Sequence, residues 1–210
     1  MSAALKLKVC GMRDPENILE VSKLEPDFMG FIFYTPSPRY VGDHFRMPEF
    51  AGVTKKVGVF VDEATEEIMK KVREFGLDFV QLHGHESVQQ CREIKSEDIG
   101  VIKVFSVDDM MDFGTTEAFG SVVDHFLFDT KGKYYGGNAK RFNWDVLRGY
   151  HQEIPFFLSG GITPAHIEDV RKLNHDQLQA VDVNSGVEIS PALKNVQQIK
   201  VIKTILNSKR

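Results

Sequence analysis

The chain of 210 residues contains only two cysteines, Cys10 and Cys91, and they lie far apart in the sequence. Two distant cysteines in a chain of this length do not form a disulfide framework, so the sequence indicates a reducing setting. No apolar run approaches the roughly 18 residues of a membrane-spanning helix, and residues 1–8 lack the apolar core of a signal peptide. We therefore expect a cytoplasmic protein without a membrane partner.

The sequence also lacks an excess of charge of either sign. Lys and Arg number 26 against 30 Asp and Glu, which gives a formal net charge of −4. The basic residues are scattered, so we expect no nucleic acid partner. Hydrophobic residues make up 42% of the chain, enough for a large core, and no linker or low-complexity tract divides it. We expect one domain over residues 1–210.

Short apolar runs rich in Val, Ile and Phe recur along the whole chain. Their hydrophobicity is nearly continuous rather than alternating, which is typical of parallel strands that helices cover. We predict strands at residues 6–10, 28–33, 56–61, 79–82, 101–105, 125–129, 154–159 and 180–184.

Helical patterns lie between these predicted strands. Asp14 and Pro15 predict the N-cap and the first turn of one helix, and Thr163 with Pro164 predict the same for another. Eight alternating units favour a single (β/α)8 TIM barrel, an α/β fold. An open doubly wound sheet is the alternative, but no G-x-G-x-x-G motif follows the first strand. Further helices are predicted after residue 62, at residues 87–94, 108–119 and 144–150, and from residue 196 onward.

In such barrels the chemistry is found at the carboxyl ends of the strands. Cys10 ends the first strand, where it is either a small buried hydrophobe or a thiolate that acts as base or nucleophile. Asp129 ends the sixth strand, and no predicted helix begins directly after it, which weakens the alternative of a helix cap. Together they would supply a base and an acid to one pocket.

Other polar residues lie at or beside strand ends. Arg39, in a proline-rich loop, is either a solvated side chain or a clamp for a carboxylate. We expect Gln81 and His83 to bind substrate; His83 and His85 alone make weak evidence for a metal, so no metal is predicted. Asp182 interrupts an apolar strand, so it either faces the substrate or forms a buried pair.

Glycine-containing turns end the last two predicted strands. Gly160 and Gly161 follow the seventh strand, and Ser185 and Gly186 follow the eighth. Backbone amides in such turns bind anions, and barrels often hold a phosphate at these two positions. We predict a phosphate site there. The long loops at residues 34–44 and 130–142 are candidates for substrate binding or closure over the site.

Taken in order, nine short segments resemble the phosphoribosylanthranilate isomerase family. The resemblance spans almost the whole chain, and the ordered set is far more specific than any one member. The segments are KVCGM at 8–12, PSPRYV at 36–41, VGVFV at 57–61, QLHG at 81–84, LFDT at 127–130, YGG at 135–137, FNW at 142–144, LSGGI at 158–162 and VDVNSGVE at 181–188.

This resemblance implies an isomerase of the aldose–ketose type that needs no cofactor and acts in tryptophan biosynthesis. Its substrate would be N-(5-phosphoribosyl)anthranilate, which an Amadori rearrangement converts to 1-(o-carboxyphenylamino)-1-deoxyribulose 5-phosphate. The resemblance implies Asp129 as general acid, Cys10 as general base, Arg39 as the clamp for the anthranilate carboxylate and Asp182 as a contact near the reacting centre. The two glycine turns would hold the phosphate.

Two other functions stay open at this stage. Another sugar-phosphate barrel enzyme, such as an epimerase, would need metal-ligating His and Asp residues at several strand ends, and the second predicted strand ends without either. A barrel that only binds a phosphorylated ligand is the other alternative. The sequence also leaves open whether the protein is a monomer or a homodimer.

Overall fold

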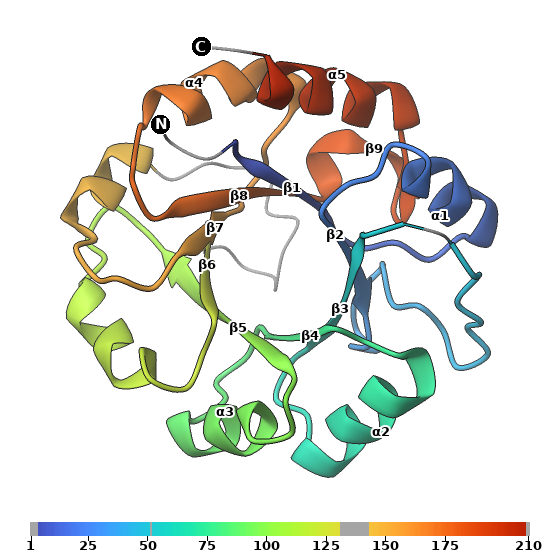
Figure 1. Ribbon diagram of the computed structural model, residues 1–210, viewed down its shortest axis with the longest axis horizontal. Coiled ribbons are helices and arrows are strands. Elements are labelled where there is room, and N and C mark those ends of the chain that lie inside the picture. Colours follow the sequence, from blue (N-terminus) through green and yellow to red (C-terminus); the bar gives the residue numbers. More distant parts are fainter. Residues whose placement is uncertain (1–3, 51, 131–142, 209–210) are drawn as a thin grey trace.

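Parallel strands close into a barrel, and helices surround it (Figure 1). The computed structural model describes residues 4–50, 52–130 and 143–208. The strands follow chain order around the barrel, and β1 pairs with β8 to close it, so the predicted TIM barrel is confirmed. The strands are β1 Lys6–Val9, β2 Phe28–Ile32, β3 Lys55–Phe60, β4 Phe79–Leu82, β5 Gly100–Val107, β6 His125–Thr130, β7 Phe156–Leu158 and β8 Leu178–Val183.

The α-helices of the described residues pack on the outer face of the barrel (Figure 1). The side chain of Asp14 accepts a hydrogen bond from the backbone N of Asn17, so the predicted cap of the first helix is confirmed. Pro15 occupies its first turn, where a missing N–H costs nothing. The α-helices are α1 Pro15–Ser22, α2 Thr65–Phe75, α3 Val88–Lys95, α4 Ile167–Lys172 and α5 Val196–Asn207.

Some connections differ from the regular pattern of strand and helix. The helices predicted at 108–119 and 144–150 are wrong in type, because the structure has 3₁₀ helices at Phe113–Phe119 and Trp144–Gly149. In the first of these, the hydroxyls of Thr115 and Thr116 donate to carbonyls three residues earlier, which favours the tighter turn. Shorter 3₁₀ helices occupy Pro164–His166 and Ser185–Val187.

Every second residue of each strand faces the barrel interior, which divides into an apolar part and a polar part. The apolar part lies toward the amino ends of the strands, and rings such as Phe28 and Phe157 pack there with centroids 5.0 Å apart. The polar part lies toward the carboxyl ends, where Gln81, Asp129 and Asp182 are buried. The barrel is thus filled with side chains at one end and holds chemistry at the other.

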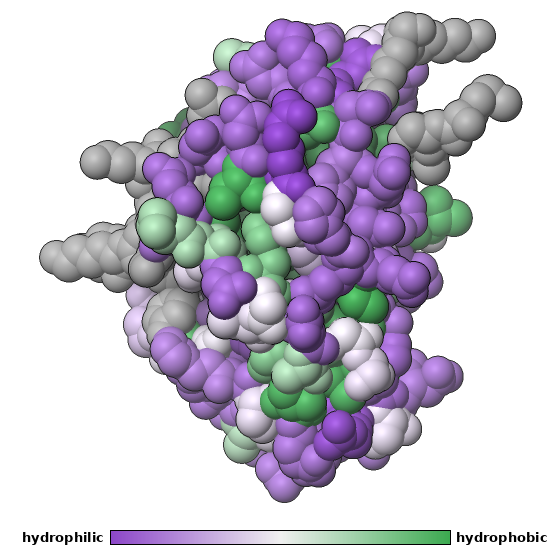
Figure 2. Space-filling view, turned by 90° about the vertical axis from the view of Figure 1, so that its left-hand side faces the viewer, coloured by the Kyte–Doolittle hydropathy of each residue, from purple (hydrophilic) through white to green (hydrophobic). Residues whose placement is uncertain are grey.

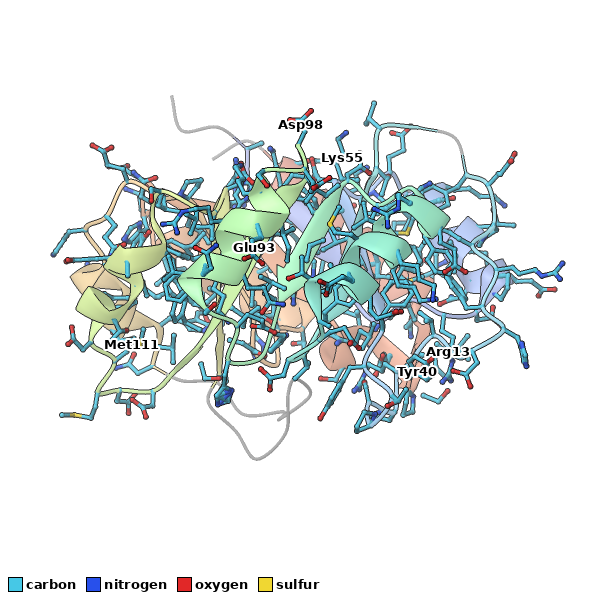
Figure 3. All side chains as sticks on the ribbon, turned by 90° about the horizontal axis from the view of Figure 1, so that it is seen from below. Arg13, Tyr40, Lys55, Glu93, Asp98 and Met111 are labelled. Atoms are coloured by element: carbon cyan, nitrogen blue, oxygen red, sulfur yellow. The ribbon has the colours of Figure 1, made fainter. Side chains whose placement is uncertain are left out.

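The two ends of the barrel are distinct in side view. Figure 3 shows Arg13, Tyr40 and Met111, which follow strands, toward one end of the molecule. Lys55, which begins β3, and Asp98, which precedes β5, project toward the opposite end. These described residues place the carboxyl ends of their strands at one rim of the barrel.

The outer wall is mainly polar. Figure 2 shows one side of it, on which hydrophilic residues predominate and hydrophobic ones form small separate patches. The most exposed large hydrophobic side chains, Val53, Met110 and Ile189, lie in separate segments. In the described part of the chain, we find no helix with the length and apolar character needed to cross a membrane.

A small antiparallel hairpin follows β8 and docks on α1. Its strands are β9 Glu188–Ser190 and β10 Leu193–Lys194. The buried amide of Asn17 accepts from the backbone N of Lys194 at 2.8 Å and donates to its carbonyl oxygen at 3.0 Å. One side chain thus satisfies two buried backbone groups and fixes the hairpin against the barrel.

We expect Asn17→Ala to lower the free energy of unfolding by about 2 to 4 kcal/mol, because it leaves two buried backbone groups without partners. Urea denaturation followed by circular dichroism would measure this. The control is Glu20→Ala on the exposed side of the same helix, which should stay within about 0.5 kcal/mol of the native chain. Equal stability of the two variants would contradict the bridging role of Asn17.

Candidate active site

A cavity opens at the carboxyl ends of the strands, inside the rim. Eight of the ten predicted site residues line it. They come from both halves of the chain, and the closed barrel brings them together. The eight are Cys10, Gln81, His83, Asp129, Gly160, Gly161, Asp182 and Ser185. The two that do not line the cavity are Arg39 and Gly186, and no group of three or more potential metal-ligating His, Cys, Asp or Glu side chains occurs among the described residues.

Cys10 continues β1 to the cavity floor. Its side chain is 3% exposed, and its backbone N donates to the carbonyl oxygen of Val183 at 2.9 Å. A Cβ atom at Gly30 on β2 would lie 2.7 Å from the Cys10 sulfur. The glycine of the neighbouring strand therefore provides the space that the thiol occupies.

Asp129 faces the same cavity from β6. Its Oδ1 accepts from the backbone N of Thr130 at 2.9 Å, and its Oδ2 lies 3.5 Å from Nε2 of His83. The amide of Gln81 lies 3.2 Å from Nδ1 of the same imidazole. A nitrogen of the amide can only donate, so in this arrangement Nδ1 accepts and the ring proton lies on Nε2, toward Asp129. Oε1 of Gln81 is buried without a hydrogen-bond partner among the described residues, so a ligand donor would satisfy it.

Asp182 forms the buried pair that was one of its two predicted roles, and it also lines the cavity. Its Oδ1 accepts from Nζ of Lys8 at 2.8 Å, with exposed side-chain fractions of 5% and 0%. The two residues are register partners on β8 and β1. Burial alone would lower the pKa of Lys8, but the carboxylate of Asp182 and the thiol of Cys10 together raise it above its ordinary value.

Arg39 lies beside the cavity and is held by an acid. Its Nε and Nη2 donate to the carboxylate of Glu188, with the shortest contact at 2.6 Å. Nη1 has no hydrogen-bond partner among the described residues, so the edge formed by Nη1 and Nη2 is available to a second carboxylate. Glu188 also accepts from Nζ of Lys194 at 2.6 Å. Burial would raise the pKa of Glu188, but Arg39 and Lys194 together lower it.

The two glycine turns that were predicted to bind phosphate lie at the rim. Their glycines are required for different structural reasons. Gly160 and Gly161 have φ values of 103° and 63°, which only glycine adopts readily, and their backbone N–H groups donate to no described residue. A Cβ atom at Gly160 would lie 2.1 Å from Oγ1 of Thr130. Gly186 is required by packing instead, because a Cβ atom there would lie 2.0 Å from the carbonyl oxygen of Ile162. The first turn therefore offers free donors for an anion.

Several site residues escaped the analysis of the sequence. Lys8 could have been found, because a lysine inside an apolar strand two residues before Cys10 must face the same side. Asn184 also could have been found, because it ends the predicted eighth strand. Its partner Lys194 carried no such signal, since it reaches the site from the hairpin outside the barrel. Burial lowers the pKa of Lys194 to about 8, although Glu188 opposes this. The loop at 131–142, predicted to bind substrate or close over it, lies outside the described residues.

Comparison with known proteins identifies the family. Residues 7–204 match the family model described as N-(5'phosphoribosyl)anthranilate (PRA) isomerase. The isomerase of that name from Phocaeicola vulgatus is 45% identical over 190 residues, which is 90% of this chain and 91% of the relative. The crystal structure of the enzyme from Thermotoga maritima superposes with a TM-score of 0.81 at 31% identity, covering 94% of this chain and 96% of the other. The chain belongs to the N-(5′-phosphoribosyl)anthranilate isomerase family.

Proposed function

We propose that this chain rearranges N-(5-phosphoribosyl)anthranilate to 1-(o-carboxyphenylamino)-1-deoxyribulose 5-phosphate in tryptophan biosynthesis. A solved isomerase in complex with the reduced form of that product resembles the chain with a TM-score of 0.78 at 29% identity, covering 95% of this chain and 97% of the other. The observation that carries the proposal is the placement of Cys10 and Asp129 on one cavity, from β1 and β6. No observation favours a second function.

Asp129 is the general acid in this proposal. Its protonated carboxyl gives its proton to the furanose ring oxygen, the bond between that oxygen and C1′ breaks, and the nitrogen lone pair forms a cationic imine. The fixed hydrogen bond from Thr130 N holds one carboxyl oxygen, which leaves Oδ2 on the side of His83. Holding the acid in one orientation removes much of the entropic cost of the proton transfer.

Cys10 is the general base. Its sulfur takes the proton from C2′, whose acidity the adjacent cationic imine increases, and the electron pair of that bond forms an enolamine. Tautomerisation then adds a proton at C1′ and removes one from the 2′ hydroxyl, which yields the ketone. The two steps need an acid and a base on separate sides of the sugar, and β6 and β1 supply them.

The remaining predicted residues orient the substrate in this proposal. The phosphate lies against the N–H groups of Gly160 and Gly161, with Ser185 beside them. The anthranilate ring lies toward the apolar wall of Ile32 and Val59 on the opposite side of the cavity, and its carboxylate takes the free edge of Arg39. Gln81 and His83 face the sugar between them.

Cellular context and assembly form part of the same proposal. Both cysteines are free and buried, which fits the reducing cytoplasm. The only partner we propose besides further copies of the chain is the small-molecule substrate, without a cofactor, nucleic acid or membrane. We propose that residues 1–210 act as one domain, either as a monomer or as a homodimer, since a relative from Thermotoga maritima is described as dimeric.

We expect Cys10→Ala and Asp129→Ala each to reduce kcat by about 100- to 10,000-fold, because each removes one proton-transfer group. The measurement is the loss of fluorescence of freshly generated phosphoribosylanthranilate, with folding checked by circular dichroism. Cys91→Ala, which alters the other buried thiol away from the cavity, is the control and should keep native kcat. Near-native turnover of both site variants would refute the proposed acid and base.

We expect Arg39→Met to raise KM about 10- to 100-fold with a smaller change in kcat, because charge-assisted hydrogen bonds to the carboxylate contribute about 1.5 to 3 kcal/mol. The matched control is Arg148→Met, which removes an arginine that is 72% exposed and does not line the cavity. A native KM in Arg39→Met would remove this residue from the carboxylate site.

A further inference from the structure

One buried cation in the barrel has no part in the steps above. Lys8 is fully buried on β1, and the alternation of the strand places it on the same inner face as Cys10, two residues later. Its ammonium has three N–H groups, and the carboxylate of Asp182 is the one oxygen acceptor to which it donates among the described residues. Lys8 and Cys10 are also close enough for each to act on the charge of the other. A lysine is costly to bury, so its placement beside the reactive thiol needs a reason.

The charged groups around Cys10 come from several elements. Asp182 on β8 and Lys194 on the hairpin join Lys8 in acting on it directly. Burial raises the pKa of the Cys10 thiol above its ordinary value, Lys8 and Lys194 oppose this shift without cancelling it, and Asp182 adds to it. The further titratable groups that line the cavity are Tyr34, His83 and Asp129, and Tyr34 packs against the cluster of Cys10, Ile32 and Val59. Arg39 and Glu188 lie beside the cavity.

We propose that Lys8 is a positioning residue that favours the thiolate form of Cys10, the form in which the sulfur accepts the C2′ proton. The inference rests on the proposed function of Cys10 as the base. The cationic imine arises only after ring opening, so before that step the protein itself must balance the negative sulfur. Each turnover leaves the sulfur protonated, and that proton must leave to solvent before the next one. Lys8 favours this loss because its positive charge faces the same side of the strand as the sulfur and stabilises the thiolate.

A second buried lysine provides a matched control, which separates an effect of Lys8 on Cys10 from an effect on stability. Lys103 on β5 is also buried and also bonds a carboxylate, Glu86, at 2.8 Å. Its other acceptors are the carbonyl oxygens of Leu82 and Gly84, and the groups that act on Cys10 do not include it. Both lysines stabilise a buried ion pair, but only Lys8 faces the thiol.

The test is the rate at which iodoacetamide alkylates Cys10 as a function of pH. Mass spectrometry of the Cys10 peptide quantifies this thiol alone in the otherwise native chain. We expect Lys8→Met to move the midpoint of the profile upward by about one to three pH units, because it removes an opposite charge next to the thiolate. Lys103→Met should leave the midpoint where the native chain has it. A folded Lys8→Met with the native midpoint would overturn the proposal.

A second variant keeps the test decisive if Lys8→Met does not fold. Asp182→Asn removes the anion that competes for Lys8 and repels the thiolate. Asp182→Asn alone should lower the midpoint, because it removes an anion that acts on Cys10 directly. In this background both members of the ion pair can be neutral, so Lys8→Met together with Asp182→Asn tests the lysine without leaving a buried carboxylate unpaired. The midpoint of the double variant should lie above that of Asp182→Asn, and equal midpoints in the two would overturn the role of Lys8.

Activity assays distinguish failure of this inference from failure of the proposed function. Alkylation requires no substrate, so it reports only on the coupling between Lys8 and Cys10. In Lys8→Met, the acidic limb of the profile of kcat/KM against pH should move upward with the alkylation midpoint, because the thiolate then forms only at higher pH. If the alkylation midpoint moves but the acidic limb of the kcat/KM profile does not, the interaction between Lys8 and Cys10 is upheld and Cys10 is refuted as the base.

Discussion

The pairing of β1 with β8 is the constraint on which the site depends. This pairing closes the barrel, and its register sets Lys8 opposite Asp182. The backbone hydrogen bond from Cys10 to Val183 extends the same pairing past the end of β1. A slip by one residue would turn every inward side chain of β1 outward, so Lys8 and Cys10 face the barrel interior only in this register. Closure of the fold therefore also positions the proposed catalytic base.

Burying charged side chains near the carboxyl ends of the strands costs free energy, and the formation of ion pairs offsets this cost. The ion pairs Lys8–Asp182, Lys103–Glu86 and Lys194–Glu188 have contacts of 2.6 to 2.8 Å and are almost fully shielded from solvent. Such pairs add little stability compared with apolar packing of the same volume. They also hold site groups in place, as Glu188 holds Arg39, so their presence here is better explained by function than by stability.

Much of the fold could be predicted because continuous apolar runs identify covered parallel strands. The limits of β4 were predicted at both ends, and Asp14 was predicted as a cap because its signal is local. The 3₁₀ helix at Phe113–Phe119 was not predicted, since threonine hydroxyls and a glycine decide it rather than periodicity. The site residues at strand ends could also be predicted, because the predicted strands show where each strand ends. Lys194 could not be predicted, because only the docking of the hairpin on Asn17 brings it to the rim.

Charge is distributed unevenly across the cavity, and this unevenness suits the two proton transfers. The cations Lys8, Lys194 and Arg39 gather on the side of β1, β8 and the hairpin, where the thiolate and the substrate carboxylate need them. Across the cavity, the neighbours of Asp129 among the described residues are a backbone amide and the imidazole of His83 rather than a lysine or arginine. The proposed base thus lies among cations, and the proposed acid lies apart from them. One cavity therefore offers two different electrostatic surroundings, one for each of the proposed proton transfers.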